Sequence, residues 1–424
     1  MLTKIQNALH ENNISSWRIR EIREETAELF FVKKELDMRR IKDVCKYEVT
    51  LFRDGENARG KTRASATIVL PASMEEKAIV QELKDAYFAA QFAANPMYDL
   101  PDSVVADPIF KTGELAELPL IDTAWKMAGA LFAPDNRSDA FVNSAEVFAS
   151  RISRRILSSY GTDVLYTDGN INGEFVVQCL SPEDVEMHHT FSYNEVETNA
   201  LSAKVAEALT FVCDRAAAQN ILKSGEYDLI LSGNAVSTVL SYYTSRSSAY
   251  MLYAKYSGWQ VGDAVQGTDC VGEKLNLTLC ATVPYDGEGI PMQDRPLLSY
   301  GELSAVHGSN RFCRYLGVKP TGSYGKVRCD NGTVSFEQMK QKPCLWAVSF
   351  SDFQMDDFSG HFGGEIRLAY LISDGKVIPV TGGSVNGSLL EVQKNLQFST
   401  DRYVTSSYDG PNALRLEGIS VAGV

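Results

Sequence analysis

Two long stretches of this chain alternate apolar and polar residues in consecutive short runs, and they constrain the fold more than any other feature. The first covers residues 17–70 and the second residues 150–193, with turn residues such as Asp54-Gly55-Glu56-Asn57 between runs. A period of two is typical of strands that bury one face of a sheet. Because the runs follow one another without regular helical insertions, the sequence predicts an α+β fold rather than a doubly wound parallel sheet.

Helical patterns flank these stretches. Apolar residues spaced three and four apart, from Leu201 to Ala216, predict an amphipathic helix over residues 195–219. The segment Ser73-Met74-Glu75-Glu76 is interpreted as a capping box, in which the serine and glutamate side chains bond free amides at a helix start. The other helices of the first half are expected over residues 1–12, 73–94, 121–132 and 143–149.

The segment Lys223-Ser224-Gly225-Glu226 separates the 195–219 helix from an apolar strand that opens the second half. A length of 424 residues suits two or three domains of roughly 150 residues each. We therefore expect an N-terminal α+β domain over residues 1–222 and a strand-rich, mixed C-terminal domain over residues 223–424.

Charge and hydropathy narrow the class of protein. The formal charge of -13 argues against a nucleic-acid surface, because neutralising phosphates requires clustered Lys and Arg. No stretch approaches the roughly 18 apolar residues that a membrane span requires. The opening residues have the pattern of a polar amphipathic helix rather than of a secretory signal, so the cytoplasm is the expected location.

Cysteine and histidine spacing gives no metal-peptidase signature. The eight cysteines include no Cys-x-x-Cys pair and are expected to be free thiols, and Cys213, beside Asp214, is expected to have a raised pKa if it is buried. None of the five histidines stands in a His-Glu-x-x-His frame. Adjacent His188 and His189 would point to opposite faces of a strand, one buried and one solvated.

Several segments of the second half, taken in order, resemble the TldD/PmbA family, whose members form cytoplasmic peptidase complexes and carry the label of DNA gyrase modulators. The strongest are Phe358-Ser359-Gly360 and the run from Ala369 to Gly387, which contains Leu371-Ile372-Ser373-Asp374-Gly375-Lys376. Residues 285–291 and 414–423 resemble a turn and the closing strand of the family. The resemblance implies the two-domain TldD/PmbA architecture.

This family has two branches, and the residues of this chain resemble the branch without a metal. One branch holds zinc with a His-Glu-x-x-x-His helix and a late cysteine, whereas the PmbA/TldE branch lacks that motif and pairs with the first. Here Gly233 and Asn234 stand for the first histidine and the glutamate, and Thr238 stands for the second histidine. No cysteine lies between Leu396 and Pro411. Glycine offers no ligand atom and asparagine cannot act as a general base.

The resemblance therefore implies a non-catalytic PmbA/TldE-like subunit with no cofactor of its own. Its partner would be a zinc-bearing TldD-like chain, and the complex would cleave unfolded peptides or small proteins. The candidate peptide contacts lie at the glycine-containing start of a predicted strand, where missing side chains let another backbone approach closely. These contacts are Phe358, Ser359, His361, Gly363 and Gly364, with ordinary turn geometry as the competing interpretation.

Two alternatives of other classes stay open. The chain could be a homo-oligomeric peptide-binding or scaffold protein, for which a homodimer without a peptidase partner is expected. It could also be a peptidase with a non-metal nucleophile, for instance Ser384 or Cys329, although Gly382-Gly383-Ser384-Val385-Asn386 lacks the last glycine of a nucleophile elbow. The acidic composition offers gyrase modulation no direct route through DNA.

Overall fold

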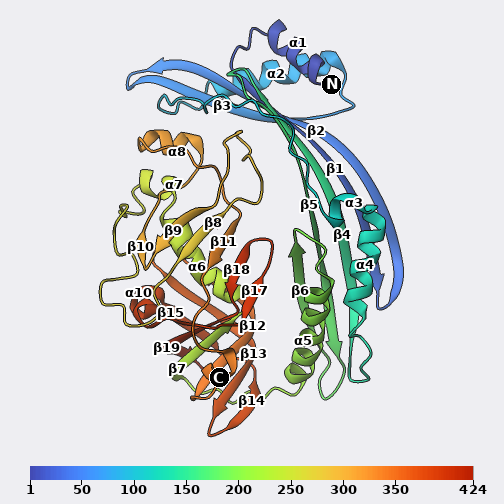
Figure 1. Ribbon diagram of the computed structural model, residues 1–424, viewed down its shortest axis with the longest axis vertical. Coiled ribbons are helices and arrows are strands. Elements are labelled where there is room, and N and C mark those ends of the chain that lie inside the picture. The colour runs from blue at the N-terminus through green and yellow to red at the C-terminus, as the bar shows by residue number, and fades with distance from the viewer. Residues whose placement is uncertain (424) are drawn as a thin grey trace.

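A long, curved antiparallel sheet dominates the first half of the computed structural model, which describes residues 1–423 (Figure 1). Its strand order is β3-β2-β1-β4-β5-β6, so β1 and β4 lie in the middle and pair along almost their whole lengths. The strands are β1 (Trp17–Val32), β2 (Glu35–Asn57), β3 (Gly60–Pro71), β4 (Ala140–Ser158), β5 (Asp163–Cys179) and β6 (Val185–Tyr193).

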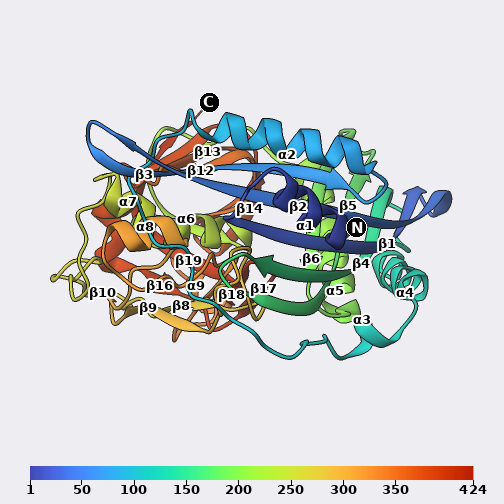
Figure 2. The same cartoon turned by 90° about the horizontal axis from the view of Figure 1, so that it is seen from above.

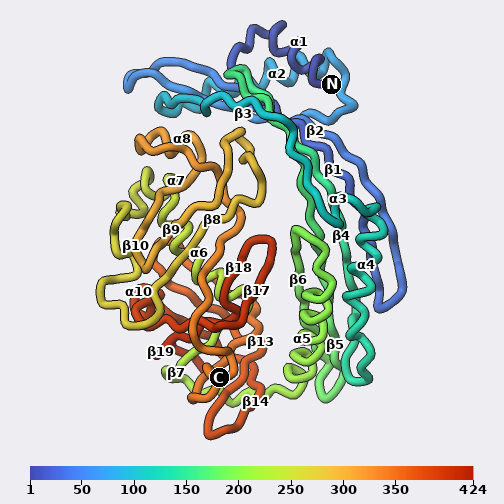
Figure 3. The backbone as a smooth tube through the Cα atoms, viewed as in Figure 1, coloured from blue at the N-terminus to red at the C-terminus, as the bar shows by residue number. Residues whose placement is uncertain are grey.

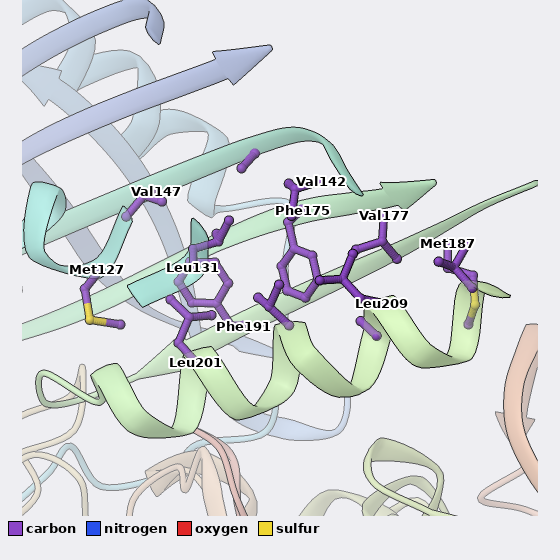
Figure 4. Packing of buried hydrophobic residues seen from close by; sticks show 14 of the residues in the cluster. Met127, Leu131, Val142, Val147, Phe175, Val177, Met187, Phe191, Leu201 and Leu209 are labelled. Carbon is purple, nitrogen blue, oxygen red and sulfur yellow. The ribbon is translucent and has the colours of Figure 1, made fainter. Parts of the chain in front are cut away.

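Helices cover this sheet at both ends. At one end, α1 (Leu2–Glu11) and α2 (Glu76–Ala90) bury Ile5, Leu9, Ile79 and Leu83 against β1, β2 and β3. At the other end, α4 and α5 cover the apolar face of β1, β4, β5 and β6, and Figure 4 shows Leu201 and Leu209 of α5 pointing toward the strand residues Phe191 and Phe175. The helices of this end are α3 (Glu114–Glu117), α4 (Leu120–Phe132) and α5 (Thr198–Ala216).

The helices predicted over residues 121–132 and 195–219 are confirmed, but two local predictions are wrong. The segment 143–149, predicted to be helical, lies inside β4, where Val142, Ala145, Val147 and Ala149 are buried and the strand pairs on both sides. Pairing with β1 and β5 there outweighs the helix propensity of the alanines. The capping box at Ser73 does not form either: α2 begins at Glu76, has no side-chain cap and ends at Ala90.

The second half contains a closed ring of strands. β12 (Cys344–Met355) is parallel to β7 (Gly225–Ser232), which pairs with β19 (Ala413–Ala422). β19 pairs with β15 (Ser384–Ser388), β15 with β13 (His361–Ser373), and β13 returns to β12. Each strand in the ring therefore has neighbours on both sides. β14 (Lys376–Val380) and β16 (Gln397–Phe398) attach outside it, to β13 and β19.

A second sheet of short strands packs near this ring, in the order β10-β9-β8-β11-β18-β17. Helix α6 (Asn234–Arg246) contributes Val236, Val239, Leu240 and Tyr243 to a core that also includes residues of both sheets. The strands are β8 (Leu277–Cys280), β9 (Arg295–Ser299), β10 (Glu302–Leu303), β11 (Lys326–Cys329), β17 (Arg402–Val404) and β18 (Tyr408–Pro411). The remaining helices are α7 (Ala249–Tyr253), α8 (Asn310–Tyr315), α9 (Phe336–Met339), α10 (Leu389–Val392) and the 3-10 turn η1 (Gln393–Asn395).

The two halves lie side by side, and the chain crosses between them after α5 (Figures 2 and 3). The core under α4 and α5 also contains Ile230, Leu368 and Tyr370 from the second half. Farther along the sheet, Arg18 of β1 forms an ion pair with Glu288 at 3.2 Å. The overall class is α+β, as predicted. No helix within residues 1–423 is long and apolar enough to cross a membrane.

Candidate functional site

A pocket of about 370 Å³ lies where strands β4, β5 and β6 face the start of α6. The hairpin between β17 and β18 closes one side of it, and α5 contributes a lysine. Its lining includes residues from both halves of the chain: Glu146, Phe148, Glu174, Thr190, Ser192, Lys204, Asn234, Tyr403 and Ser406. Of the residues singled out by sequence reasoning, only Asn234 lines it.

Three side chains from distant parts of the sequence meet in this pocket. Gly233, at φ +60°, turns the chain from β7 into α6 and places Asn234 at the first position of the helix. The Tyr403 hydroxyl donates to Oδ1 of Asn234 at 3.0 Å, and Nζ of Lys204 donates to the Tyr403 hydroxyl at 3.3 Å. The Lys204 ammonium also lies 5.6 Å from the centroid of the Tyr403 ring.

Sequence reasoning missed Tyr403 and Lys204, although one signal was present. Tyr403 lies in the segment between Leu396 and Pro411, where the metal-binding branch is expected to carry its cysteine. The structure brings this segment against the start of α6, so the two places where metal ligands are absent from the sequence are neighbours in space. No sequence pattern indicated a role for Lys204, because it lies on the polar face of the predicted amphipathic helix.

The residues at the start of α6 do not fit a zinc ion. Zinc in proteins is held by imidazole nitrogen, thiolate and carboxylate. Asn234 provides only an amide oxygen that already accepts a hydrogen bond, and the hydroxyl of Thr238 donates to the Asn234 carbonyl at 3.0 Å. Within residues 1–423 no three His, Cys, Asp or Glu side chains gather in a metal-binding arrangement.

The opposite wall of the pocket is acidic. Glu146 of β4 and Glu174 of β5 are directly opposite each other in the sheet, an arrangement in which like charges repel. Burial raises the pKa of Glu146, and the negative charges of Glu174 and Glu28 raise it further. Nε2 of His188 lies within hydrogen-bond distance of the Glu174 carboxylate, at 3.2 Å. The pocket thus has an anionic wall and a cationic side at Lys204.

The edge strand β6 is open beside the pocket. Within the described chain β6 pairs only with β5. Its outer side is contacted by the Ser406 amide, which donates to the Ser192 carbonyl at 3.0 Å, and by the Arg215 guanidinium, which donates to the Glu186 carbonyl. Because alternate residues of an edge strand point their backbone groups outward, Thr190 presents its amide and carbonyl between these two contacts.

His188 and His189 follow the predicted division. His188 is exposed, whereas His189 stacks on Phe175 with ring centroids 5.2 Å apart and has a buried Nε2. Burial lowers the pKa of His189, and with smaller contributions from the nearby Lys204 and His188 it falls to about 4. His189 is therefore neutral at pH 7. The two rings lie on opposite faces of β6.

The predicted peptide contacts, in β13 and the turn that precedes it, lie at the other end of α6. Phe358 is 57% exposed and packs on Tyr256, and its carbonyl accepts from Arg246 at the last residue of α6. A helix of 13 residues is about 20 Å long, so this segment does not join the pocket at Asn234. Ser359 and His361 are held near Asp356, whose carboxylate accepts from the Ser359 hydroxyl at 2.5 Å.

The two glycines of that segment serve contacts within the chain. A side chain on Gly363 would meet the Val385 carbonyl at 2.7 Å, and one on Gly364 would meet the Asp352 carbonyl at 2.4 Å. Strands β15 and β12 therefore occupy both sides of β13 here. A peptide cannot add to β13 as a strand unless it displaces one of them. Contact with Phe358 or His361 side chains stays a prediction.

The two nucleophile candidates are poorly placed. Cys329 is 3% exposed, and burial together with the charges of Asp330 and Glu273 raises the pKa of its thiol. Burial also raises the pKa of Cys213, to about 12, as expected. Ser384 lies in β15 opposite Glu365 and Ala422, not on the strand-to-helix turn that exposes a nucleophilic serine.

Comparison of the sequence with known proteins gives matches to one family. Residues 224–423 match the family described as "PmbA/TldA metallopeptidase C-terminal domain". The chain is 29% identical over 163 residues to a metalloprotease TldD homolog of Haemophilus influenzae and 28% identical over 167 residues to one of Buchnera aphidicola. Each match covers 32% of this chain and 34% of the relative, so it spans about a third of the length of these curated relatives.

Solved structures share the fold over the whole chain. TldE from Thermococcus kodakarensis is 16% identical with a TM-score of 0.79, over 99% of this chain and 100% of that one. A protein from Bacteroides thetaiotaomicron, named as a candidate modulator of DNA gyrase, is 16% identical with a TM-score of 0.80, over 100% and 99%. A similarly named protein from Thermotoga maritima is 13% identical with a TM-score of 0.77, over the full length of both chains. The sequence matches therefore place residues 224–423 in the TldD/PmbA family, and the structural matches show that the whole chain has the fold of these proteins.

Proposed function

We propose that this chain is the non-catalytic, PmbA/TldE-like subunit of a peptidase complex, in which a zinc-bearing member of the same family hydrolyses the peptide bond. The observation that carries the proposal is the chemistry at the start of α6. Asn234, Thr238 and Tyr403 are hydrogen-bonded to one another or to the backbone, and none of them is a good zinc ligand. The Asn234 amide, which stands where the glutamate would, cannot act as a general base.

In this proposal the pocket between the two halves receives an extended segment of an unfolded peptide. The open edge of β6 at Thr190 offers backbone hydrogen bonds, which give affinity without requiring a particular sequence. Lys204 and the pair Glu146 and Glu174 line the same pocket and would contact charged side chains or chain ends. The volume of about 370 Å³ is at the lower end of the usual range for ligand pockets and suits a short segment.

A reconstitution experiment tests the subunit role. The purified chain is mixed with a zinc-bearing family member, and the mixture is analysed by size-exclusion chromatography and by digestion of an unstructured peptide. The proposal expects one complex that cleaves the peptide, and no cleavage by this chain alone. Separate elution of the two chains, or full activity of the zinc-bearing chain without this one, would contradict it.

A matched pair of variants tests the pocket within that complex. Lys204→Met removes the cationic side of the pocket, whereas Lys77→Met removes an exposed lysine from α2, on the far end of the sheet. The first is expected to raise the apparent KM for an acidic peptide, and the second to leave it unchanged. Equal behaviour of the two variants would remove the pocket from the proposal.

The chain's setting is also part of the proposal. All eight cysteines are free, and Cys179, Cys280, Cys313, Cys329 and Cys344 are buried. Free thiols in such number suit a reducing compartment, which supports a cytoplasmic location. We propose no role in gyrase modulation, because the formal charge of -13 argues against a DNA-binding surface.

A further inference from the structure

A second pocket, of about 560 Å³, lies in the second half of the chain and shares no lining residue with the pocket at Asn234. This volume is within the usual range for small-molecule sites. Its lining comes from β7, β19, η1 and the loops packed against them. Five of the lining side chains carry charges, of both signs: Asp228, Glu273, Lys342, Arg415 and Glu417. The second pocket therefore suits a small polar ligand rather than an apolar one.

Contacts within the chain hold one wall of the second pocket in place. The Glu273 amide donates to the Leu396 carbonyl at 2.9 Å, and the Glu273 carboxylate accepts from the amides of Thr333 and Phe398. A side chain on Gly272 would meet the Leu396 carbonyl at 2.6 Å, so this loop lies directly against the chain beside η1. Because these contacts tie three separate segments together, the wall is formed before any ligand binds.

A β-bulge brings two carboxylates together in another wall. The register between β19 and β7 shifts between Leu416 and Ile419, so Glu417 and Gly418 oppose the single residue Asp228. Gly418 has a φ of +66°, which glycine adopts without strain. Asp228 and Glu417 both line the second pocket, and like charges in neighbouring strands repel each other.

Only one of these two carboxylates has a cation beside it within residues 1–423. Arg415 is 5% exposed and donates to Oδ2 of Asp228 at 2.6 Å. Glu417 forms no ion pair in the described chain and accepts from Nδ2 of Asn395 at 3.2 Å, while Oδ1 of Asn395 is buried and has no donor. The ammonium of Lys342, another lining residue, pairs with no carboxylate of residues 1–423. The second pocket thus contains acceptors without donors and a cation without a partner.

We propose that the second pocket binds a free basic α-amino acid, of the class of L-arginine and L-lysine. An ammonium group has three hydrogens, which match the acceptors on Glu417, Asp228 and Asn395, and the ligand's carboxylate contacts Lys342. A simple anion is disfavoured by the three carboxylates of the lining, and a simple cation by its two cationic side chains. Three negative and two positive charges leave one negative charge, so a ligand with one net positive charge is preferred.

This inference does not rest on the subunit role proposed above. The two pockets have no lining residue in common, and binding of a free amino acid is measured on this chain alone. Failure of the amino-acid site therefore leaves the peptide-binding proposal untouched, and a chain that binds no zinc-bearing partner can still bind the amino acid.

Titration calorimetry of the full-length chain with four probes tests the ligand class. The probes are L-arginine, its Nα-acetyl derivative, its decarboxylated analogue agmatine, and L-glutamate. We expect L-arginine to bind, the acetylated and decarboxylated forms to bind at least about tenfold more weakly, and L-glutamate not to bind. No binding of L-arginine at millimolar concentration overturns the proposal. Equal binding of L-arginine and agmatine also overturns it, because the surface would then attract any cation.

Two variants with matched controls test the place of binding. Glu417→Gln and Lys342→Met are each expected to weaken L-arginine binding at least about tenfold, and in Lys342→Met L-arginine should bind no more tightly than agmatine. Glu391→Gln of α10 and Lys376→Met of β14 change exposed residues outside the second pocket and are expected to bind like wild type. Residues 417 and 342 are also exposed, so far-UV circular dichroism should match wild type. Binding by both pocket variants at the level of the controls overturns the proposal.

Discussion

At the scale of single residues, the pocket is defined by a chain of hydrogen bonds rather than by metal ligands. Lys204, Tyr403 and Asn234 connect α5, the β17–β18 hairpin and α6. None of the three is a good zinc ligand in this setting, so the start of α6 offers a polar contact surface. The role proposed for this chain depends on that chemistry.

Removing the Tyr403 hydroxyl tests this surface. Tyr403→Phe keeps the ring but breaks both hydrogen bonds, to Asn234 and from Lys204. Since a neutral hydrogen bond contributes roughly 0.5–1.5 kcal/mol, we expect binding of a fluorescent unstructured peptide to weaken about two- to tenfold. Anisotropy titration measures the change. Unchanged affinity, with thermal stability also unchanged, would show that the hydroxyl has no part in binding.

His189 gives a prediction for pH. Its pKa falls from about 6.5 in the unfolded chain to about 4 in the folded protein, so the unfolded state binds an extra proton between these values. Stability is therefore lost as pH falls below about 6.5, by roughly 2 kcal/mol between pH 7 and pH 5.

Urea unfolding of wild type and His189→Phe at pH 7 and pH 5 measures this contribution. The variant keeps a ring to stack on Phe175 but cannot titrate. We expect the stability difference between the two pH values to shrink by the amount given above. Parallel pH dependence in the two proteins would mean that His189 is not the group responsible.

At the scale of elements, the apolar face of β4, β5 and β6 against α5 holds the acidic wall of the pocket in place. Phe175 of β5 is completely buried there and lies next in sequence to Glu174. The strand alternates its side chains between the core and the pocket, so core packing fixes the position of the carboxylates.

Truncation of Phe175 measures this packing. Phe175→Ala is expected to cost roughly 3–5 kcal/mol of unfolding free energy, because it removes a buried ring and leaves a cavity. Phe92→Ala, at a position that is 75% exposed, is the control and is expected to change stability by less than about 0.5 kcal/mol. Chemical denaturation of both variants gives the comparison. Similar losses would contradict the assignment of the core.

Much of the element pattern could be predicted from sequence, because α5 and the long strands carry clear periodicities of their own. The helix predicted over residues 143–149 is wrong because alanines favour a helix locally, whereas pairing with β1 and β5 makes this segment a strand. Asn234 was found through its place in a motif. Lys204 and Tyr403 are 199 residues apart, and no local pattern predicts that they meet.

At the scale of the whole molecule, the two halves share a core. Tyr370 of β13 donates to Asp214 of α5, and Leu368 packs in the same cluster. The domain division after residue 222 stays a prediction. Because the two halves share a core, separating them at this point would have a measurable effect. Residues 1–222 alone would expose apolar surface that the second half covers.

Calorimetry tests this coupling. We expect the full chain to unfold in one cooperative transition, and a fragment of residues 1–222 to bind a hydrophobic dye and to melt at lower temperature. Separation of the full chain's unfolding into two independent transitions would show that the halves are energetically separate.

The central claim is that this chain leaves metal chemistry to another subunit. Elemental analysis of the purified chain, after dialysis against zinc and then against metal-free buffer, tests it most directly. We predict that no transition metal is retained in stoichiometric amount. One tightly bound zinc ion per chain, lost when Asn234 or Tyr403 is replaced by alanine, would contradict the account.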